Sequence, residues 1–439
     1  MSEHGLLTSS IQYGIVARSI PLSGKVLKGY IDASGTGLGI GNPNVEFTPN
    51  VSTCTMSSDG GTARVFWGKR NGEVALTVAN RVMDSRAASK FIRCGVNEQH
   101  EGAVQQLIPD AHTNTFSSAG ADGRIKLWDT KTLQLLWSTD KQQLSLVADP
   151  FISVAGSLGD GFIAGALKSG DILLYDLHES EAPADGPRVR SIHQLRISPP
   201  IHNERTTRGD DGLPQQQVAK MWLYRTGEVS VLLLVQYTHH PQVYRVHANV
   251  QSHDVTITSF GDSSFSDVST LEPIISVHSH DNNMLIVGDQ LGFVSIYDAD
   301  VPLQTSVAPV HRFEAHTDGS VTAISWSPIV FATGSARGTT VVWDSLTLEP
   351  MRYFTTPAPR PAPGHDWDVV SRISVDKALV VIIVGNRVMT WKVGQVNGRE
   401  YQHKKTKHAN NKINVTAKGH RKPPLHYFHS PSDPRSRTT

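Results

Sequence analysis

The residues of this chain that could bind a metal are first of all its 20 histidines. His278 and His280 are two residues apart in SVHSHD, a spacing that places both side chains on one face of a strand. A zinc site needs three or four ligands, and no third ligand adjoins this pair. The sequence also has no HExxH or CxxC motif. We interpret the pair as a loop feature and expect neither a metal nor another cofactor.

Two further patterns bear on catalysis. The stretch SGTGLGIGNP (34–43) has the alternating glycines of a nucleotide loop, but it lacks a GK[ST] ending, no clear strand precedes it, and Pro43 obstructs a following helix. We interpret it as a flexible connector. Cys54 and Cys94 lie in no nucleophile signature, and no GxSxG elbow occurs. We therefore expect no enzyme activity, and the two cysteines fit a reducing compartment.

A third glycine-containing stretch, AGADGRIKLWD (119–129), is repeated along the chain. A turn residue, alternating apolar positions and an aromatic five residues on recur in full or diverged form at a period near fifty. The fifth positions are Thr77, Trp128, Tyr175, Val246, Tyr297, Trp343 and Trp391. The one long interval contains residues 178–217, whose Pro, Gly and charge content indicates an inserted loop. Seven units follow.

Each unit carries several strand-like runs. Unit six reads VTAISWSP, VFATGSAR, TTVVWDS and PMRYFTT, four strands separated by turn residues. Seven such units predict an all-β, seven-bladed β-propeller of four-stranded blades. The last unit has no convincing fourth strand, so we expect residues 11–31 to pair into the last blade and close the ring. The predicted organisation is a flexible N-terminus (1–10), a propeller (11–397) and a disordered basic tail (398–439).

These motifs resemble the WD40-repeat family. The family signature has a His before the first strand, an Asp in the second turn and Trp-Asp at the end of the third strand, and unit two has each of these. The resemblance implies a structural hydrogen-bond tetrad in which the His links the buried Trp N–H to the Ser and the Asp; its members here are His100, Ser118, Asp122 and Trp128. Unit six keeps His316, Thr333 and Trp343 but has Arg337 in place of the Asp.

The turns between second and third strands lie on one rim in WD40 propellers. Six of the seven turns place a basic residue or a His there, and this set predicts a surface for an acidic or phosphorylated peptide, because Arg pairs with such oxygens bidentately. The residues are Lys69, Arg70, Arg124, Lys168, His239, His240, Arg337 and Arg387. The alternative is that basic residues are simply common in exposed turns.

The predicted function is a non-catalytic scaffold for protein–protein interaction. The long-looped blades and the closing GNRVMTWKVG are also similar to fungal F-box/WD-repeat proteins, which implies substrate recognition for a ubiquitin ligase complex. Residues 1–45 lack the amphipathic helical pattern of an F-box.

The C-terminal charge favours another partner class. Residues 399–439 hold ten Lys and Arg against two acidic residues, whereas the whole chain has a net charge of +1. The alternative function is therefore an RNA- or ribosome-associated propeller that uses this tail. The longest apolar runs, Val229–Val235 and Ala378–Val384, are shorter than the roughly 20 residues that cross a bilayer. We expect no membrane association and a cytoplasmic or nuclear location.

Overall fold

The structure is a computed structural model of the 439-residue chain. It describes residues 6–10, 15–20, 25–32, 38–39, 50–59, 62–79, 90–110, 113–139, 149–179, 189–200, 217–238, 240, 242–261, 273–279, 283–301, 306–327, 329–355, 369–376, 379–385 and 387–392. The described residues form β-strands and one 3₁₀ helix, η2 (Val96–Glu98), so the predicted all-β class is confirmed. No helix in these ranges has the length and apolar character that a membrane crossing requires.

Seven sheets follow the seven sequence units, and we number these repeat sheets from one to seven. The first three comprise β5 (Val51–Asp59), β6 (Thr62–Lys69), β7 (Val74–Ala79) and β8 (Lys90–Arg93); β9 (Val104–Pro109), β10 (Thr115–Gly120), β11 (Ile125–Asp129) and β12 (Leu135–Ser138); and β13 (Phe151–Ser157), β14 (Phe162–Leu167), β15 (Ile172–Glu179) and β16 (Val189–Ile197). The fourth comprises β17 (Val218–Arg225), β18 (Ser230–Tyr237), β19 (Val243–Asn249), β20 (Val255–Phe260) and the added β24 (Ser306–Val307).

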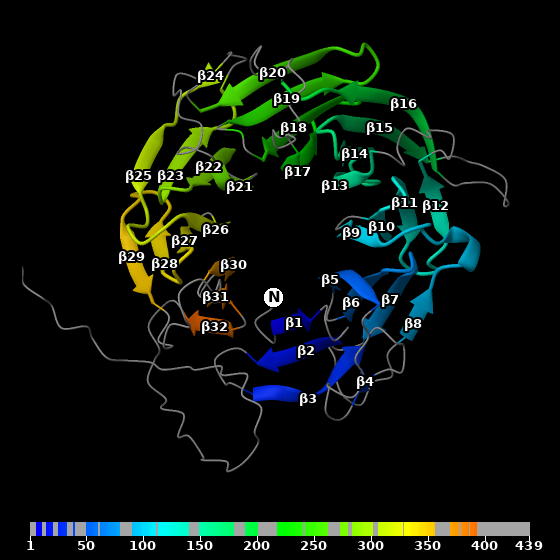
Figure 1. Ribbon diagram of the computed structural model, residues 1–439, viewed down its shortest axis with the longest axis horizontal. Helices are drawn as coiled ribbons and strands as arrows, with labels where there is room; N and C mark the ends of the chain where they lie inside the picture. The colour runs from blue at the N-terminus through cyan, green and yellow to red at the C-terminus, as the bar shows by residue number, and fades with distance from the viewer. Residues whose placement is uncertain are drawn as a thin grey trace, which may run out of the picture.

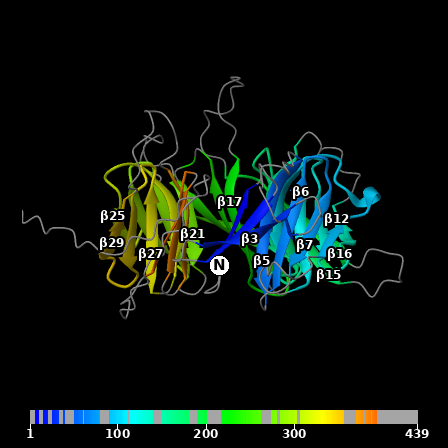
Figure 2. The ribbon, with the colours of Figure 1, turned by 90° about the horizontal axis from the view of Figure 1, so that it is seen from below.

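The remaining repeat sheets continue this antiparallel order. They comprise β21 (Pro273–Ser279), β22 (Met284–Asp289), β23 (Phe293–Asp298) and β25 (His311–Glu314); β26 (Val321–Trp326), β27 (Val330–Ser335), β28 (Thr340–Asp344) and β29 (Pro350–Phe354); and β30 (Val370–Asp376), β31 (Leu379–Val384) and β32 (Arg387–Lys392). In each sheet the first strand in sequence is innermost, and the sheets are arranged as blades around a common centre (Figure 1). Seen edge-on, the ring is a disc whose strands run between its two faces (Figure 2).

The N-terminal strands differ from the prediction. β1 (Leu6–Ser10), β2 (Ile15–Ile20), β3 (Lys25–Asp32) and β4 (Leu38–Gly39) pair only with one another, so they form an eighth sheet. The expectation that residues 11–31 pair into the last blade is wrong, because the backbone N–H and C=O groups of these strands form their hydrogen bonds within a separate sheet. In Figure 1 this N-terminal sheet lies between β5 and the three-stranded seventh repeat sheet.

Two predicted loops contain strands. The stretch 34–43, interpreted as a connector, includes β4 and follows β3, contrary to our expectation that no strand precedes it. The segment 178–217 includes β16, the outer strand of the third repeat sheet; residues 180–188 and 201–216 lie outside the described residues. Residues 6–10 of the N-terminus that we expected to be flexible (1–10) instead form β1. Residues 1–5 and the predicted basic tail (398–439) lie outside the described residues.

The recurrent glycine of the sequence pattern is explained by the turn between the second and third strands. Gly72, Gly123, Gly170, Gly292 and Gly338 all have positive φ, between 70° and 96°. L-amino acids with a Cβ adopt this conformation rarely, whereas glycine adopts it freely. A Cβ at Gly72 would also collide with the carbonyl oxygen of His100. We call the end of the ring that carries these five turns the turn rim; the inner strands begin at this rim.

Apolar contacts between neighbouring sheets form the core. Trp128, Phe116 and Phe66 are buried together between the first and second repeat sheets. The inner strands also lie against one another, with β9 beside β5 and β13, and β26 beside β21 and β30. Buried clusters join each pair of consecutive repeat sheets, so the second to sixth repeat sheets are packed on both faces.

Candidate functional site

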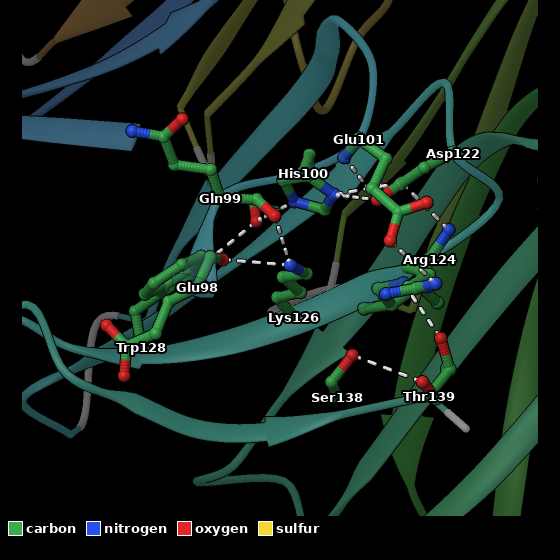
Figure 3. Close-up of polar contacts among 12 residues, drawn as sticks. Glu98, Gln99, His100, Glu101, Asp122, Arg124, Lys126, Trp128, Ser138 and Thr139 are labelled. Atoms are coloured by element: carbon green, nitrogen blue, oxygen red, sulfur yellow. Dashed lines mark hydrogen bonds and ion pairs between the residues drawn. The ribbon is translucent and has the colours of Figure 1, made fainter. Parts of the chain in front are cut away.

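The second repeat sheet contains a continuous hydrogen-bond chain at the turn rim. Trp128 Nε1 donates to Ser118 Oγ at 2.8 Å, and Ser118 Oγ lies 2.7 Å from His100 Nε2. His100 Nδ1 then lies 2.9 Å from Asp122 Oδ1. The four residues proposed from sequence are thus brought together, with the order Trp, Ser, His, Asp: the Trp N–H meets Ser118 rather than His100. Figure 3 shows the His100–Asp122 part of this chain.

The pKa shifts of Asp122 and His100 indicate which group donates and which accepts in this hydrogen-bond chain. Burial favours a neutral Asp122 carboxyl, but hydrogen bonds from His100 and from the backbone N–H groups of Glu101 and Arg124 hold its pKa below the usual range. Burial lowers the pKa of His100, so its imidazole is neutral near pH 7. Neutral His100 donates from Nδ1 to the Asp122 carboxylate, and its Nε2 accepts from Ser118.

A Ser–His–Asp chain is also the arrangement of a nucleophilic triad. Ser118, however, is 1% exposed, and its Oγ already accepts the Trp128 N–H. A nucleophile has to reach a substrate atom, and Ser118 is enclosed by the sheet. The arrangement therefore acts within the fold: it satisfies a buried indole N–H and ties the loop that carries His100 to the turn that carries Asp122.

The sixth repeat sheet has the same chain without its acidic end. Trp343 Nε1 donates to Thr333 Oγ1 at 2.9 Å, and His316 Nε2 lies 2.9 Å from the same oxygen. Among the described residues, His316 Nδ1 is buried without a hydrogen-bond partner. The nearest carboxylate oxygen, Oδ1 of Asp318, is 3.9 Å away, and Asp318 Oδ2 instead accepts from Ser335 and Thr339. Arg337 is exposed.

Sequence reasoning missed Asp318 and a related pair in the first repeat sheet. Asp318 belongs to the loop HTDGSV, which is one residue longer than the matching HEGAV after His100, and this extra residue was the available signal. In the first sheet Trp67 Nε1 donates to Thr77 Oγ1 at 2.9 Å. Here the indole comes from the second strand and the hydroxyl from the third, the reverse of the second sheet.

A buried lysine adjoins the tetrad. Lys126 on β11 is 3% exposed, and its Nζ donates to the carbonyl oxygens of Glu98 and Gln99, both at 2.8 Å (Figure 3). Burial lowers the pKa of this ammonium. The carbonyls belong to the end of η2 and the residue after it, so Lys126 holds the loop that presents His100. The repeat RIKLWD gave no sign of this role, because the third position varies between units.

The predicted basic surface on the turn rim is present only in part. Lys69 is buried, with its Nζ 2.8 Å from Glu73 Oε1, and His240 is buried with Tyr244 Oη 3.0 Å from its Nδ1. These two residues do not belong to an exposed surface, because each side chain turns back onto a partner in its own sheet. Arg124 is half-buried, and its Nη2 lies 3.3 Å from Glu101 Oε1.

Four other predicted residues are described. Arg70, Lys168 and Arg337 are exposed, and Arg387 is half-buried. His239 lies outside the described residues, as do His280 and the side chain of His278 on β21. Within the described ranges no three His, Cys, Asp or Glu residues form a group that could hold a metal ion.

Acidic residues near the turn rim are engaged by arginines of the outer strands. Arg93 lies 3.5 Å from Glu73, Arg312 lies 3.4 Å from Asp289, and Arg196 pairs with Asp171. The three arginines occupy equivalent positions, opposite the third residue after the turn glycine in β7, β15 and β23. These pairs neutralise buried turn carboxylates in the first, third and fifth repeat sheets, and Arg70 and Lys168 remain as exposed basic side chains in the first and third turns.

Two segments match the family model "WD domain, G-beta repeat": residues 93–129 and 307–344. They contain the complete hydrogen-bond chain of the second repeat sheet and the incomplete hydrogen-bond chain of the sixth. The chain therefore contains WD40 repeats within a β-propeller fold. WD40 propellers are generally non-catalytic scaffolds for protein interaction, in keeping with the enclosed Ser118.

Two solved structures with TM-scores above 0.5 share the fold of this chain, and a third gives a lower score. The computationally designed Ika8 protein is 17% identical, with 90% of this chain and 94% of the other covered and a TM-score of 0.57. Sqt1 of Saccharomyces cerevisiae is 11% identical, with 78% and 82% covered and a TM-score of 0.55. The β-propeller domain of Cps50 (Swd1) from Myceliophteria thermophila is 13% identical, with 79% and 98% covered and a TM-score of 0.49. No curated protein sequence matches the chain.

Proposed function

We propose that this WD40 propeller is a non-catalytic scaffold that binds an acidic or phosphorylated peptide across the turn rim. The observation that carries the proposal is the charge balance there. Arg70, Lys168 and Arg337 are exposed, whereas the turn carboxylates of Glu73, Asp171 and Asp289 are buried and paired within their own sheets. Exposed arginines bind phosphate and carboxylate oxygens bidentately, so a partner of opposite charge fits this face.

Charge reversal at the rim tests this function. Arg70→Glu and Arg337→Glu together should reduce capture of phosphorylated partners from native-cell extract by more than about tenfold, since each lost charged contact is worth about 1.5 to 3 kcal/mol. Arg352→Glu is the control, because Arg352 is exposed on the outer strand β29, opposite Val342, and is not a turn residue. Equal capture by the rim variant and the control variant would contradict the proposal.

The finer proposal is that the bound peptide is a substrate of a ubiquitin ligase complex. Its support is the similarity of the long-looped blades and GNRVMTWKVG to fungal F-box/WD-repeat proteins. Co-purification of Skp1-type ligase components with the full chain tests it. Capture of phosphorylated partners without any ligase component would keep the scaffold function and reject the ligase role.

The alternative proposal is an RNA- or ribosome-associated propeller. Its support is the tail, with ten basic and two acidic residues in 399–439. Binding of the full chain to RNA should then fall steeply with salt, because released counterions drive such binding, and should be lost on deletion of 399–439. Tagging the full and truncated chains in the native cell also tests the proposed cytoplasmic or nuclear location.

A further inference from the structure

An exposed serine lies where the outer strand of the third repeat sheet reaches the turn rim. Ser198 directly follows β16, the outer strand of this sheet in Figure 1. Ile197, the last residue of β16, pairs with Ile172, which is the second residue after the turn glycine Gly170. Ser198 is exposed, and its hydroxyl forms no hydrogen bond with another residue that the structure describes. An enzyme can therefore reach this hydroxyl from solvent.

The two residues after Ser198 are prolines, and they keep this part of the chain extended. Proline disfavours a helical backbone in the residue before it, so Ser198 and Pro199 are both restricted to extended conformations. Protein kinases bind the acceptor residue of a substrate within an extended segment. Proline-directed kinases also require proline directly after the acceptor, because their pocket leaves the backbone N–H of any other residue unpaired, and proline has no N–H. Ser198 and Pro199 meet both requirements.

Within the described ranges, one other serine or threonine precedes a proline in the sequence, and its hydroxyl is not available. Ser327 is half-buried in the turn between β26 and β27. Its Oγ donates to the carbonyl oxygen of Val330 at 2.7 Å and accepts the Val330 N–H at 3.2 Å. A kinase would have to break both hydrogen bonds and open the turn. Ser327 is therefore an internal comparison for Ser198.

A basic side chain shares the exposed face with Ser198. Residues 194–198 alternate between exposed and buried, so Arg196 and Ser198 lie on the same face of the sheet. Arg196 pairs with Asp171, yet 61% of its side chain remains exposed. Lys168 is also exposed, in the turn that precedes Asp171. A phosphate on Ser198 would therefore lie beside a guanidinium that it can bind through two oxygens.

We propose that Ser198 is a phosphorylation site for a proline-directed protein kinase, and that its phosphate weakens binding of an acidic partner to the turn rim. In the reaction, Ser198 Oγ forms a bond to the γ-phosphorus of ATP while the bond from that phosphorus to ADP breaks, and a base of the kinase takes the hydroxyl proton. The product gains a charge of about −1.5 to −2 near pH 7. This charge occupies Arg196 and opposes the positive charge of Lys168. The effect on binding rests on the proposed scaffold function, whereas the modification site does not.

Phosphorylation of the full chain in vitro tests the site. The chain is incubated with ATP and a purified proline-directed kinase of the mitogen-activated class, and phosphates are located by mass spectrometry. Ser198 should carry at least about ten times more phosphate than Ser327, a ratio equal to about 1.4 kcal/mol, because Ser327 has two hydrogen bonds to break. Pro199→Ala should abolish phosphorylation of Ser198, and Pro200→Ala is the matched control that should retain it. Absence of phosphate on Ser198, or equal phosphorylation of the two proline variants, would overturn the proposal.

The contact with Arg196 is tested by phosphorus NMR of the phosphorylated chain. A nearby guanidinium favours the dianion, so the second pKa of the phosphoserine should be lower in the wild-type chain than in Arg196→Gln. Arg190→Gln is the matched control, because Arg190 is exposed on the same strand, opposite His178, at the end away from the turn rim. Equal pKa values in the wild-type chain and Arg196→Gln would contradict the proposed contact.

Fluorescence anisotropy with a labelled octaglutamate peptide tests the effect on the turn rim. The phosphorylated chain should bind this acidic probe about tenfold more weakly than the unmodified chain, as expected for the loss of a charged contact worth about 1.4 kcal/mol. Ser198→Ala treated with the same kinase is the control for phosphates at other positions. Equal binding by the phosphorylated and unmodified chains would overturn the effect on the rim. Failure of the unmodified chain to bind the probe would instead reject the scaffold function, while the mass spectrometry still decides the modification site.

Discussion

The second and sixth repeat sheets align without a gap over the second strand, the turn and the third strand (115–129 and 330–344). Only the second sheet completes the hydrogen-bond chain from Trp to Asp. Gly120 and Asp122 in the second sheet correspond to Ser335 and Arg337 in the sixth. A Cβ at Gly120 would lie 2.5 Å from Oδ1 of Asp122 and would also collide with the His100 ring. The carboxylate of the turn can therefore reach the His only where the second strand ends in glycine.

The sixth sheet uses a different solution. Ser335 has the Cβ that the second sheet excludes, and its Oγ accepts the backbone N–H groups of Arg337 and Thr339. The acid moves to the longer loop as Asp318, from which it binds Ser335 and Thr339 but does not hydrogen-bond to His316. The comparison teaches that the Trp–hydroxyl–His part is sufficient for this blade, and that the acidic member depends on one glycine.

The largest expected loss of stability comes from replacing Gly120, the glycine on which the acidic member of the hydrogen-bond chain depends. Gly120→Ser should lower the free energy of unfolding by about 4 kcal/mol, because overpacking displaces both His100 and Asp122. Ser335→Gly in the sixth sheet should cost less, about 1 to 2 kcal/mol, since it adds no atom but removes a buried hydroxyl that hydrogen-bonds to Asp318, Arg337 and Thr339. Urea denaturation measures both; equal losses would remove the proposed difference between the sheets.

Removal of the Ser118 hydroxyl from the hydrogen-bond chain should give the next largest loss of stability. Ser118→Ala should cost about 3 kcal/mol, because it leaves both the Trp128 N–H and His100 Nε2 buried without a partner. Ser117→Ala is the control: Ser117 is the adjacent buried residue on β10, and its Oγ has no partner among the described residues. A comparable loss of unfolding free energy in the two variants would mean that the hydrogen bonds of Ser118 add nothing to the packing of the side chain.

Transplanting the acidic member should give a gain of about 1 kcal/mol. Ser335→Gly with Arg337→Asp recreates the second-sheet arrangement and supplies a partner for His316 Nδ1. Arg337→Asp alone should give no gain, because the Ser335 Cβ still blocks the carboxylate. Thermal or chemical unfolding of the single and double variants decides whether Ser335 is the obstacle.

The smallest expected effect is on pH dependence. Burial lowers the pKa of both His100 and His316, so the unfolded chain takes up protons at a higher pH than the folded chain. The contribution of the two neutral histidines to stability should be fully present above about pH 6.5, the ordinary His pKa, and should be lost as the pH falls towards their lowered folded pKa values. His316→Gln should reduce the slope of this loss, and an unchanged slope would show that His316 does not titrate on unfolding. Protonation of Asp122, whose folded pKa is also lowered, should add a further loss below about pH 4.

The seven repeat sheets could be predicted from sequence because each has the same local marker, a turn glycine or its equivalent before an alternating strand. The N-terminal sheet could not, since β1 to β4 lack that turn-to-aromatic pattern. The predicted tetrad residues lie together because their spacing is a property of one repeat. The burial of Lys69 could not be predicted, because it depends on Glu73 accepting its ammonium rather than on its place in a turn.

The strand β24 links the fourth and fifth repeat sheets, so the chain cannot be divided between them without breaking strand pairing. It follows β23 of the fifth repeat sheet but pairs in parallel with β20 of the fourth, and Arg245 on β19 donates to the carbonyls of Ala299 and Val301 on the way. If the gene were divided between units four and five, β24 would be encoded with unit five and separated from β20, the strand with which it pairs. A cut within 201–216, between units three and four, would leave it with its own blades, so that is the position at which two halves of this ring should reassemble.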